Sequence, residues 1–106
     1  MEARSGSSEE GSLKETVYKV EGGKTIRPRL WVEGDRIRKV EIYGDFFMYP
    51  EEAVFDLECA LTGTLTGEVG RRVEAFFSER GDVKIMGANP ADFTRAILKA
   101  IGEKSG

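Results

Sequence analysis

Two short glycine turns divide the first half of the chain into segments that read as strands. Residues 15–20 are rich in β-branched and aromatic types, and 25–33 and 36–43 alternate between apolar and polar residues, which is typical of β-structure. Between these segments stand Glu21-Gly22-Gly23 and Glu33-Gly34-Asp35, whose glycines supply the positive φ that tight hairpin turns require. Two successive tight turns predict a three-stranded antiparallel meander.

The end of the first turn, Gly23-Lys24-Thr25, matches the end of a phosphate-binding P-loop. A P-loop also needs a glycine five residues earlier and a helix after it. Tyr18 occupies the earlier position, and the segment that follows alternates and contains Pro28, which predicts a strand. Because no helix N-terminus stands behind the loop, the amides that would hold a phosphate are missing. The sequence therefore predicts a hairpin and not a nucleotide site.

Three segments with helical periodicity follow, at 50–62, 66–80 and 89–101, with a short strand predicted at 83–86. Each helical segment opens with a cap residue or a proline and closes with a glycine. The predicted order is β-β-β-α-α-β-α. This is an α+β fold in which helices pack on one face of the antiparallel meander.

Length and composition indicate one small domain. The chain has 106 residues, of which the first twelve contain almost nothing apolar. We therefore expect a disordered tail at 1–12 and a single domain at 13–104. A core built from about 90 residues has a thin stability margin, so a partner would help. With a net charge of −3, no segment apolar enough for a membrane helix and no signal-peptide pattern, the sequence predicts a cytoplasmic protein.

The chain contains no histidine and one cysteine. Without imidazole, Ser-His-Asp and Cys-His catalysis and histidine-ligated zinc are excluded, and no catalytic residue is assigned. Cys59 lies in a helical pattern beside Ala60 and Leu61, which predicts a buried structural thiol. No spacing of acidic residues suggests a metal site, so we expect this chain alone to bind no cofactor.

Basic residues concentrate on the predicted meander. Arg27, Arg29 and Trp31 alternate with the apolar residues of their strand, so they lie together on its other face. We call these three residues the basic face. Such a face can bind a nucleotide, a nucleic acid or an acidic protein surface, or it can be a solvated face whose charges discourage edge pairing. Both interpretations remain open, although the negative net charge disfavours general nucleic-acid binding.

Residues 44–50, Gly-Asp-Phe-Phe-Met-Tyr-Pro, connect the meander to the first helix. Most of this apolar cluster is expected to pack under the helices as core. Four bulky residues in a row cannot all face inward on an extended connection, so one or two are predicted to be presented to a partner. Asp45 is expected to accept hydrogen bonds from turn amides. The candidate partner-binding residues are the basic face together with Asp45, Phe46, Phe47 and Tyr49.

Four stretches of the chain resemble, in order and spacing, the small C-terminal domain of lipoate–protein ligases. They are Tyr18–Lys24, Val32–Ile37, Ile42–Phe47 with its Gly-Asp-Phe-Phe turn, and the helix that ends Leu61-Thr62-Gly63. The resemblance covers residues 17–80. As a separate chain of this length, the protein is similar to the archaeal arrangement, in which the small domain is its own subunit beside a larger catalytic one.

The resemblance implies a role in ATP-dependent lipoylation. In that family lipoate is adenylated to lipoyl-AMP and then transferred to a lysine of a lipoyl domain, in a 2-oxoacid dehydrogenase complex or the glycine cleavage H protein. The large domain holds the catalytic lysine and the pockets, and the small domain assists adenylation. The resemblance thus implies an accessory subunit, inactive alone, whose partner is the large catalytic subunit; the complex uses ATP, Mg and lipoate.

This resemblance suggests a role for the glycine hairpin. Lys19 and Lys24 flank Gly22 and Gly23 in a chain without its own nucleotide pocket. The hypothesis is that the hairpin tip faces the active site of the catalytic subunit, where one of the lysines offsets phosphate charge during adenylation. The alternatives are a nucleotide- or nucleic-acid-binding module that uses the basic face, and an adaptor that binds another protein through residues 46–49.

Overall fold

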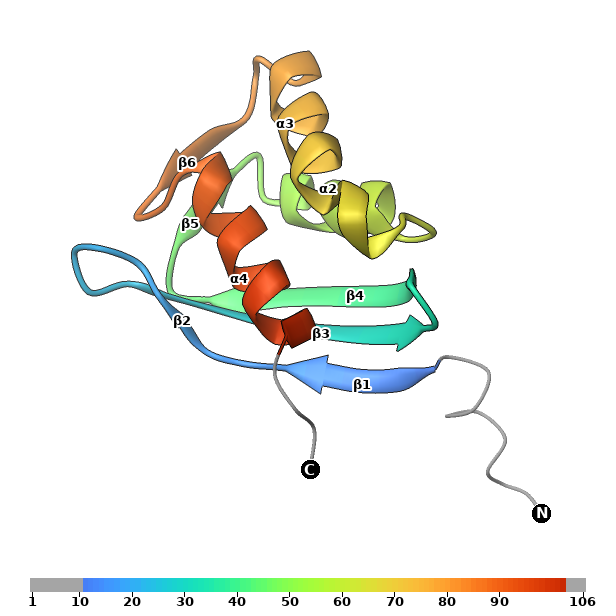
Figure 1. Cartoon of the computed structure of the whole chain (residues 1–106). Coiled ribbons are helices and arrows are strands. Elements are labelled where there is room, and N and C mark those ends of the chain that lie inside the picture. The colour runs from blue at the N-terminus through green and yellow to red at the C-terminus, as the bar shows by residue number, and fades with distance from the viewer. Residues whose placement is uncertain (1–10, 103–106) are drawn as a thin grey trace.

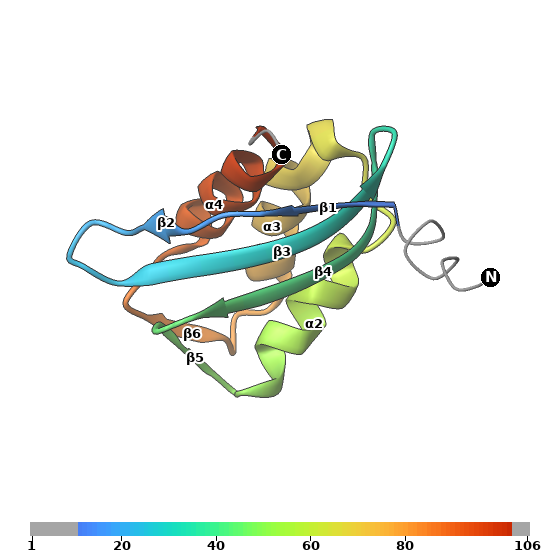
Figure 2. The ribbon, with the colours of Figure 1, turned by 90° about the horizontal axis from the view of Figure 1, so that it is seen from below.

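The computed structural model describes residues 11–102. Three helices cover one face of an antiparallel sheet and leave its other face open (Figures 1 and 2). The sheet consists of β1 (Ser12–Glu15), β2 (Tyr18–Lys19), β3 (Thr25–Glu33) and β4 (Arg36–Gly44). β3 lies at its centre, paired with β4 on one side and with both β1 and β2 on the other. Residues 1–10 of the predicted tail lie outside the described residues. The last residue of that predicted tail, Ser12, is the first residue of β1.

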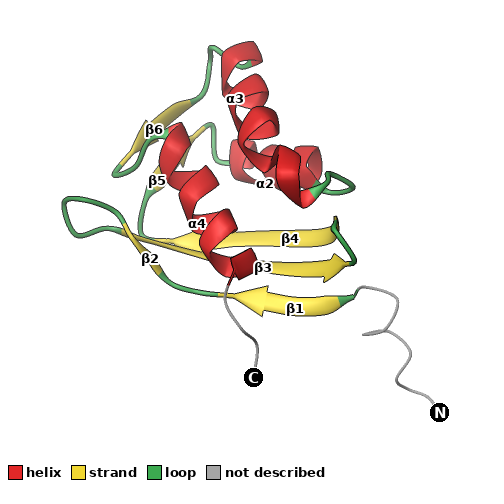
Figure 3. Ribbon diagram, viewed as in Figure 1, coloured by secondary structure: helices red, strands yellow, loops and turns green. Residues whose placement is uncertain are grey.

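The remaining elements are three helices, a 3-10 turn and a second, two-stranded sheet; Figure 3 shows the helices in red and the strands in yellow. They are β5 (Phe47–Tyr49), α2 (Glu52–Leu61), η1 (Thr66–Glu68), α3 (Val69–Glu79), β6 (Lys84–Met86) and α4 (Pro90–Gly102). β5 and β6 form an antiparallel ribbon at one end of the molecule (Figure 1). The predicted α+β class, with helices on one face of an antiparallel meander, is confirmed.

Alternating residues of β3 and β4 build the core against the helices. The apolar side chains at the even positions of β3 are buried, as the period of two predicts. From the helices, the fully buried side chains include Leu57 of α2, Val73 of α3 and Phe93 of α4. Phe93 lies at the centre of an aromatic group, with its ring centroid 5.0 Å from that of Phe46 and 6.1 Å from that of Phe77.

The predicted first strand, 15–20, is split in two opposite Pro28. β1 and β2 pair with β3 in one continuous register, in which Thr16 would stand opposite Pro28. The backbone of Thr25 faces β4, since its carbonyl accepts from the Asp45 amide at 3.3 Å. Alternation along β3 therefore turns the Pro28 nitrogen toward Thr16. Because proline has no N–H to donate, the ladder is interrupted there.

Two further predictions of local structure are corrected. α2 begins at Glu52 and not at Pro50, whose peptide bond with Tyr49 is cis. Thr66 starts η1 and does not cap α3. The reason for the first correction is long-range pairing: residues 47–49, predicted as a connection, pair with β6 and extend the strand region up to Pro50.

The prediction of a buried thiol at Cys59 is wrong, because the side chain is exposed. Leu57 and Leu61 are buried on the core face of α2, and a residue two positions from each lies about 200° around the helix. Cys59 therefore faces away from the core.

Helix α2 and the segment after it cover the free edge of β4. The Ile42 amide donates to the Glu58 carboxylate at 2.7 Å, and the Ile37 amide donates to the Thr64 carbonyl at 2.9 Å. Burial raises the pKa of Glu58 above its ordinary value, although the Ile42 amide opposes this rise. These contacts leave less of the β4 edge for pairing with another chain.

Candidate interaction surfaces

The β2–β3 hairpin tip is a tight turn that carries a lysine on either side. The Val20 amide donates to the Lys24 carbonyl at 2.7 Å, and the Gly23 amide donates to the Val20 carbonyl at 3.0 Å. Gly22 and Gly23 have φ values of 104° and 100°, a conformation that favours glycine. Lys19 and Lys24 are exposed, and within the described residues neither forms an ion pair. The predicted hairpin is confirmed.

Asp45 fastens the base of this hairpin. Its carboxylate accepts from the Thr25 amide at 2.7 Å and from the Thr25 hydroxyl at 3.4 Å. The backbone hydrogen bond from Thr25 contributes most to holding the pKa of Asp45 below its ordinary value, and the charge of Lys24 acts in the same direction. The side chain accepts a turn amide, as the sequence predicts.

A hollow of about 600 Å³ separates the hairpin tip from the start of α4. On the α4 side of the hollow, the Asp92 carboxylate accepts from the Asn89 amide at 2.9 Å, and the Asn89 side-chain oxygen accepts from the Asp92 amide at 3.2 Å. Because this reciprocal cap already satisfies amides of the helix start, they are not free for a phosphate. The hollow is lined by Val20, Glu21, Gly22, Lys24, Gly87, Ala88, Asn89, Asp92 and Arg95.

The stem of Lys24 passes directly over Gly87, which follows β6. A Cβ atom at Gly87 would lie 3.1 Å from Cγ of Lys24, and Gly87 has a φ of +94°. Glycine is therefore favoured twice at this position, by its backbone conformation and by the close approach of the lysine. The contact joins the hairpin tip to the β5–β6 ribbon.

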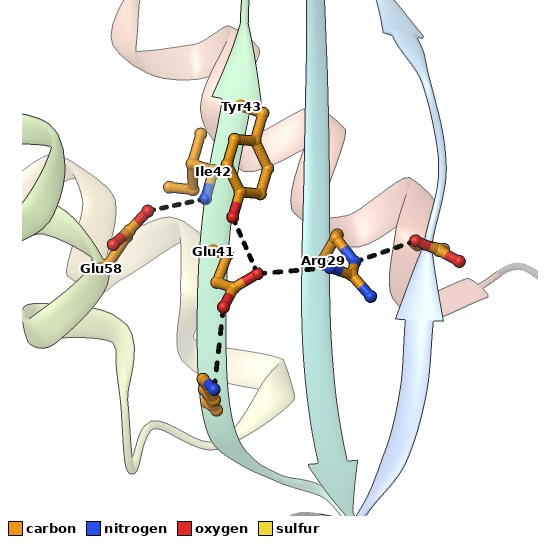
Figure 4. A network of polar contacts seen from close by, with 7 residues as sticks. Arg29, Glu41, Ile42, Tyr43 and Glu58 are labelled. Carbon is orange, nitrogen blue, oxygen red and sulfur yellow. Dashed lines mark hydrogen bonds and ion pairs between the residues drawn. The ribbon is translucent and has the colours of Figure 1, made fainter.

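The open face of the sheet carries a network of polar contacts that joins Arg29 to carboxylates of the neighbouring strands (Figure 4). The Nε of Arg29 lies 3.1 Å from Oε1 of Glu15, and its Nη1 lies 3.5 Å from Oε1 of Glu41. Glu41 also receives a 3.0 Å hydrogen bond from the Tyr43 hydroxyl, which raises the pKa of Tyr43, and lies 3.7 Å from Nζ of Lys39. Carboxylates from β1 and β4 thus neutralise part of the basic face.

The three residues of the basic face share one side of the sheet, as predicted, but they differ in environment. Trp31 lies under two cations of its own chain, with Arg29 at 5.2 Å and Lys39 at 4.9 Å from the ring centroid, which leaves less of the ring for a stacked base. Arg27 is exposed and has no ion pair within the described residues. The surface is a mixed-charge face and not a uniformly cationic one.

The interruption between β1 and β2 leaves a shallow hollow of about 370 Å³ on the same face. On the strand edge, Nζ of Lys99 donates to the Thr16 hydroxyl at 3.2 Å and to the Val17 carbonyl at 3.0 Å. The end of α4 therefore fastens the interrupted segment. The hollow is lined by Glu15, Thr16, Val17, Arg27, Pro28, Arg29 and Tyr43.

The β5–β6 ribbon has an inner and an outer side. Met48 is opposite Ile85, and both contribute to the core. On the outer side, Phe47 is opposite Met86 and Tyr49 is opposite Lys84. Three of these outer side chains are large, apolar and exposed, at 71% for Phe47, 72% for Tyr49 and 69% for Met86. We call Phe47, Tyr49, Lys84 and Met86 the ribbon surface.

Phe46 differs in burial from Phe47 and Tyr49, the other candidate partner-binding aromatics of this segment. Its ring packs edge-to-face on the buried ring of Phe93, at 5.0 Å and 89°, and the side chain is partly buried against the core. Phe47 and Tyr49 point outward. Two of the four bulky residues thus pack inward and two are exposed. That the exposed pair contacts a partner stays a prediction.

The sequence interpretation missed four surface residues. Glu15 and Glu41 lie beside Arg29, and the alternation of neighbouring strands in the predicted meander could have indicated this. Lys84 and Met86 lie beside Phe47, and no sequence pattern indicates this, because the pairing of β5 with β6 joins segments far apart in the chain.

Within residues 11–102, no group of three or more histidine, cysteine or acidic side chains could hold a metal ion. In the same part of the chain, no helix has the length and apolar character needed to cross a membrane.

Comparison with known proteins places these features in context. No protein-family model matches the chain. A curated relative, lipoate-protein ligase A subunit 2 of Thermoplasma acidophilum, is 35% identical over 72 residues, which are 68% of this chain and 74% of the relative. A chain in a solved archaeal lipoylation system from the same organism, comprising a bipartite lipoate protein ligase and its E2 lipoyl domain, is 30% identical. That alignment has a TM-score of 0.74 and covers 81% of this chain and 94% of that one.

Proposed function

The chain belongs to the lipoate-protein ligase A subunit 2 family, and from this premise we propose that it supports ATP-dependent formation of lipoyl-AMP by a separate catalytic subunit. The proposal rests on the match to lipoate-protein ligase A subunit 2, which covers 74% of the length of that ligase subunit. The chain's own composition agrees, because without histidine much of the usual acid–base and nucleophilic chemistry is closed to it.

The partners follow from the same premise. The first is the large catalytic subunit, which supplies the pockets for ATP, Mg and lipoate. The second is the lipoyl domain that receives the lipoyl group, on an E2 protein, another 2-oxoacid dehydrogenase component or the glycine cleavage H protein; this contact is indirect. A reducing cytoplasm suits a chain whose one thiol, Cys59, is free and exposed.

The hairpin tip is the part of the chain that we assign to the adenylation step. Lys19 and Lys24 project beside Gly22 and Gly23 with no ion pair in the described residues. A cation brought to the phosphates by docking would offset the charge that develops as pyrophosphate leaves. Lys24 is the stronger candidate, because its stem is fixed against Gly87.

Co-purification with the catalytic subunit, followed by an assay of lipoyl-AMP formation, tests the proposal. The wild-type chain should bind and increase the rate. Lys24→Ala should lower the stimulated rate at least about tenfold without weakening the complex, because it removes one preorganised cation. Lys39→Ala, on the open sheet face, is the matched control and should leave the rate unchanged. An unchanged rate for Lys24→Ala in an intact complex removes that lysine from the mechanism.

A further inference from the structure

The ribbon surface gathers a large share of the exposed apolar side chains. Among the described residues, seven large apolar side chains are exposed, and three of them, Phe47, Tyr49 and Met86, lie side by side on two paired strands. Single exposed apolar residues are normal on a protein surface, whereas a contiguous group marks an interaction site. Aromatic residues and methionine are also the types enriched at the centres of protein interfaces.

The two surfaces differ in how their charges are paired. On the open face, Arg29 and Lys39 are paired with carboxylates of their own chain, while the exposed Arg27 has no ion pair within residues 11–102. Lys84, on the ribbon surface, is exposed and has no ion pair within the described residues. The ribbon surface is therefore complementary to an apolar recess with a carboxylate at its rim.

We propose that the ribbon surface is the face by which this chain docks on the catalytic subunit, an inference that rests on the proposed function. Phe47, Tyr49 and Met86 enter an apolar recess of that subunit, and Lys84 meets a carboxylate beside it. The ribbon is positioned for this by its inner side, where Met48 and Ile85 pack on the core. The docking face is thus held by the fold and needs no rearrangement.

The position of the ribbon explains how docking and adenylation are connected. The stem of Lys24 lies against Gly87, the residue that follows β6, and both the hairpin tip and the ribbon lie at the same end of the molecule (Figure 1). Docking through the ribbon surface therefore brings the hairpin tip to the edge of the interface. A lysine there can reach toward a site on the partner that this chain does not itself contain.

The test measures binding and adenylation separately, with the intact chain and the catalytic subunit of the same organism. The double variant Phe47→Ala/Met86→Ala should bind at least about 30-fold more weakly, as expected when residues at an interface centre are truncated. Raising its concentration should restore lipoyl-AMP formation, because the hairpin is unchanged. Lys84→Glu should weaken binding most at low salt.

Two matched variants serve as controls. Leu98→Ala removes an apolar side chain of α4 that is 46% exposed, and Arg27→Ala removes a cation of the competing sheet face that has no ion pair within residues 11–102. Both should bind like the wild-type chain. If the double variant keeps wild-type affinity, or if Arg27→Ala loses it instead, the ribbon surface is not the docking face, and the proposed function is untouched.

Hydrogen exchange on the wild-type complex gives an answer that does not depend on how the variants fold. Amides of residues 47–49 and 84–86 should exchange more slowly on binding, while those of β1 should not change. Unchanged exchange at the ribbon in a formed complex overturns the inference. If the wild-type chain neither binds the catalytic subunit nor stimulates it, the proposed function fails and the inference falls with it.

Discussion

Truncating two neighbouring phenylalanines to alanine should have opposite consequences. Phe46 is partly buried and packs edge-to-face on Phe93, whereas Phe47 is 71% exposed. A fully buried phenylalanine costs about 3–5 kcal/mol when truncated; partial burial roughly halves this, and the lost ring pair adds about 0.5–1.5 kcal/mol. Phe46→Ala should therefore lose about 2–4 kcal/mol of unfolding free energy. Phe47→Ala should stay within about 0.5 kcal/mol of the wild type.

Thermal and urea unfolding of the isolated chain measure this difference. For a domain of this size, each kcal/mol corresponds to about 4–8 °C, so Phe46→Ala should melt at least about 8 °C below the wild type. Its urea midpoint should fall with an unchanged slope. Phe47→Ala should melt with the wild type and yet bind the catalytic subunit more weakly. Equal melting of the two variants, or a larger loss for Phe47→Ala, would refute the assignment of inner and outer sides.

Two other predictions concern the sheet. Pro28→Val restores an N–H toward Thr16, so β1 and β2 should join. The new hydrogen bond stabilises the fold by about 0.5–1.5 kcal/mol, and the greater freedom of the unfolded chain costs about 0.4–1 kcal/mol, so the free energy of unfolding should change little. The new amide of residue 28 should exchange slowly by NMR, and fast exchange would count against this explanation of the split strand. The folded pKa of Asp45 lies below its ordinary value of 3.8, so its carboxylate stabilises the fold above that pH and the contribution is lost as the pH falls through the folded pKa. Asp45→Asn should be less stable than the wild type at neutral pH and approach it in acid, and a difference independent of pH would contradict the sign.

The sequence was informative where the physical cause is local. The period of two in β3 correctly predicts that Leu30 faces the core and Arg29 the open side of the sheet. The paired glycines after Glu21 correctly predict a hairpin. Failures arise where distant segments meet. The neutralisation of Arg29 depends on Glu41 of the next strand, and the strand at 47–49 depends on a partner almost forty residues later.

Cys59 illustrates a different limit. Helical periodicity correctly places α2, but the prediction for Cys59 rests on its residue type and its neighbours Ala60 and Leu61 in the sequence. Burial depends on which face of the helix meets the sheet, and Cys59 lies about 200° around the helix from the buried Leu57 and Leu61. The candidate site was limited in the same way, because Phe46 and Phe47 are identical residues whose roles separate only once the ribbon is formed.

A titration of this chain into its catalytic subunit at fixed ATP, Mg and lipoate, with lipoyl-AMP as the readout, tests the accessory role most directly. The chain alone should make no lipoyl-AMP, and the rate should rise with added chain and saturate when the two subunits are equimolar. Lipoyl-AMP formation by the chain alone, or a catalytic subunit whose rate does not change when the chain is added, would show that the chain is not an accessory subunit of adenylation.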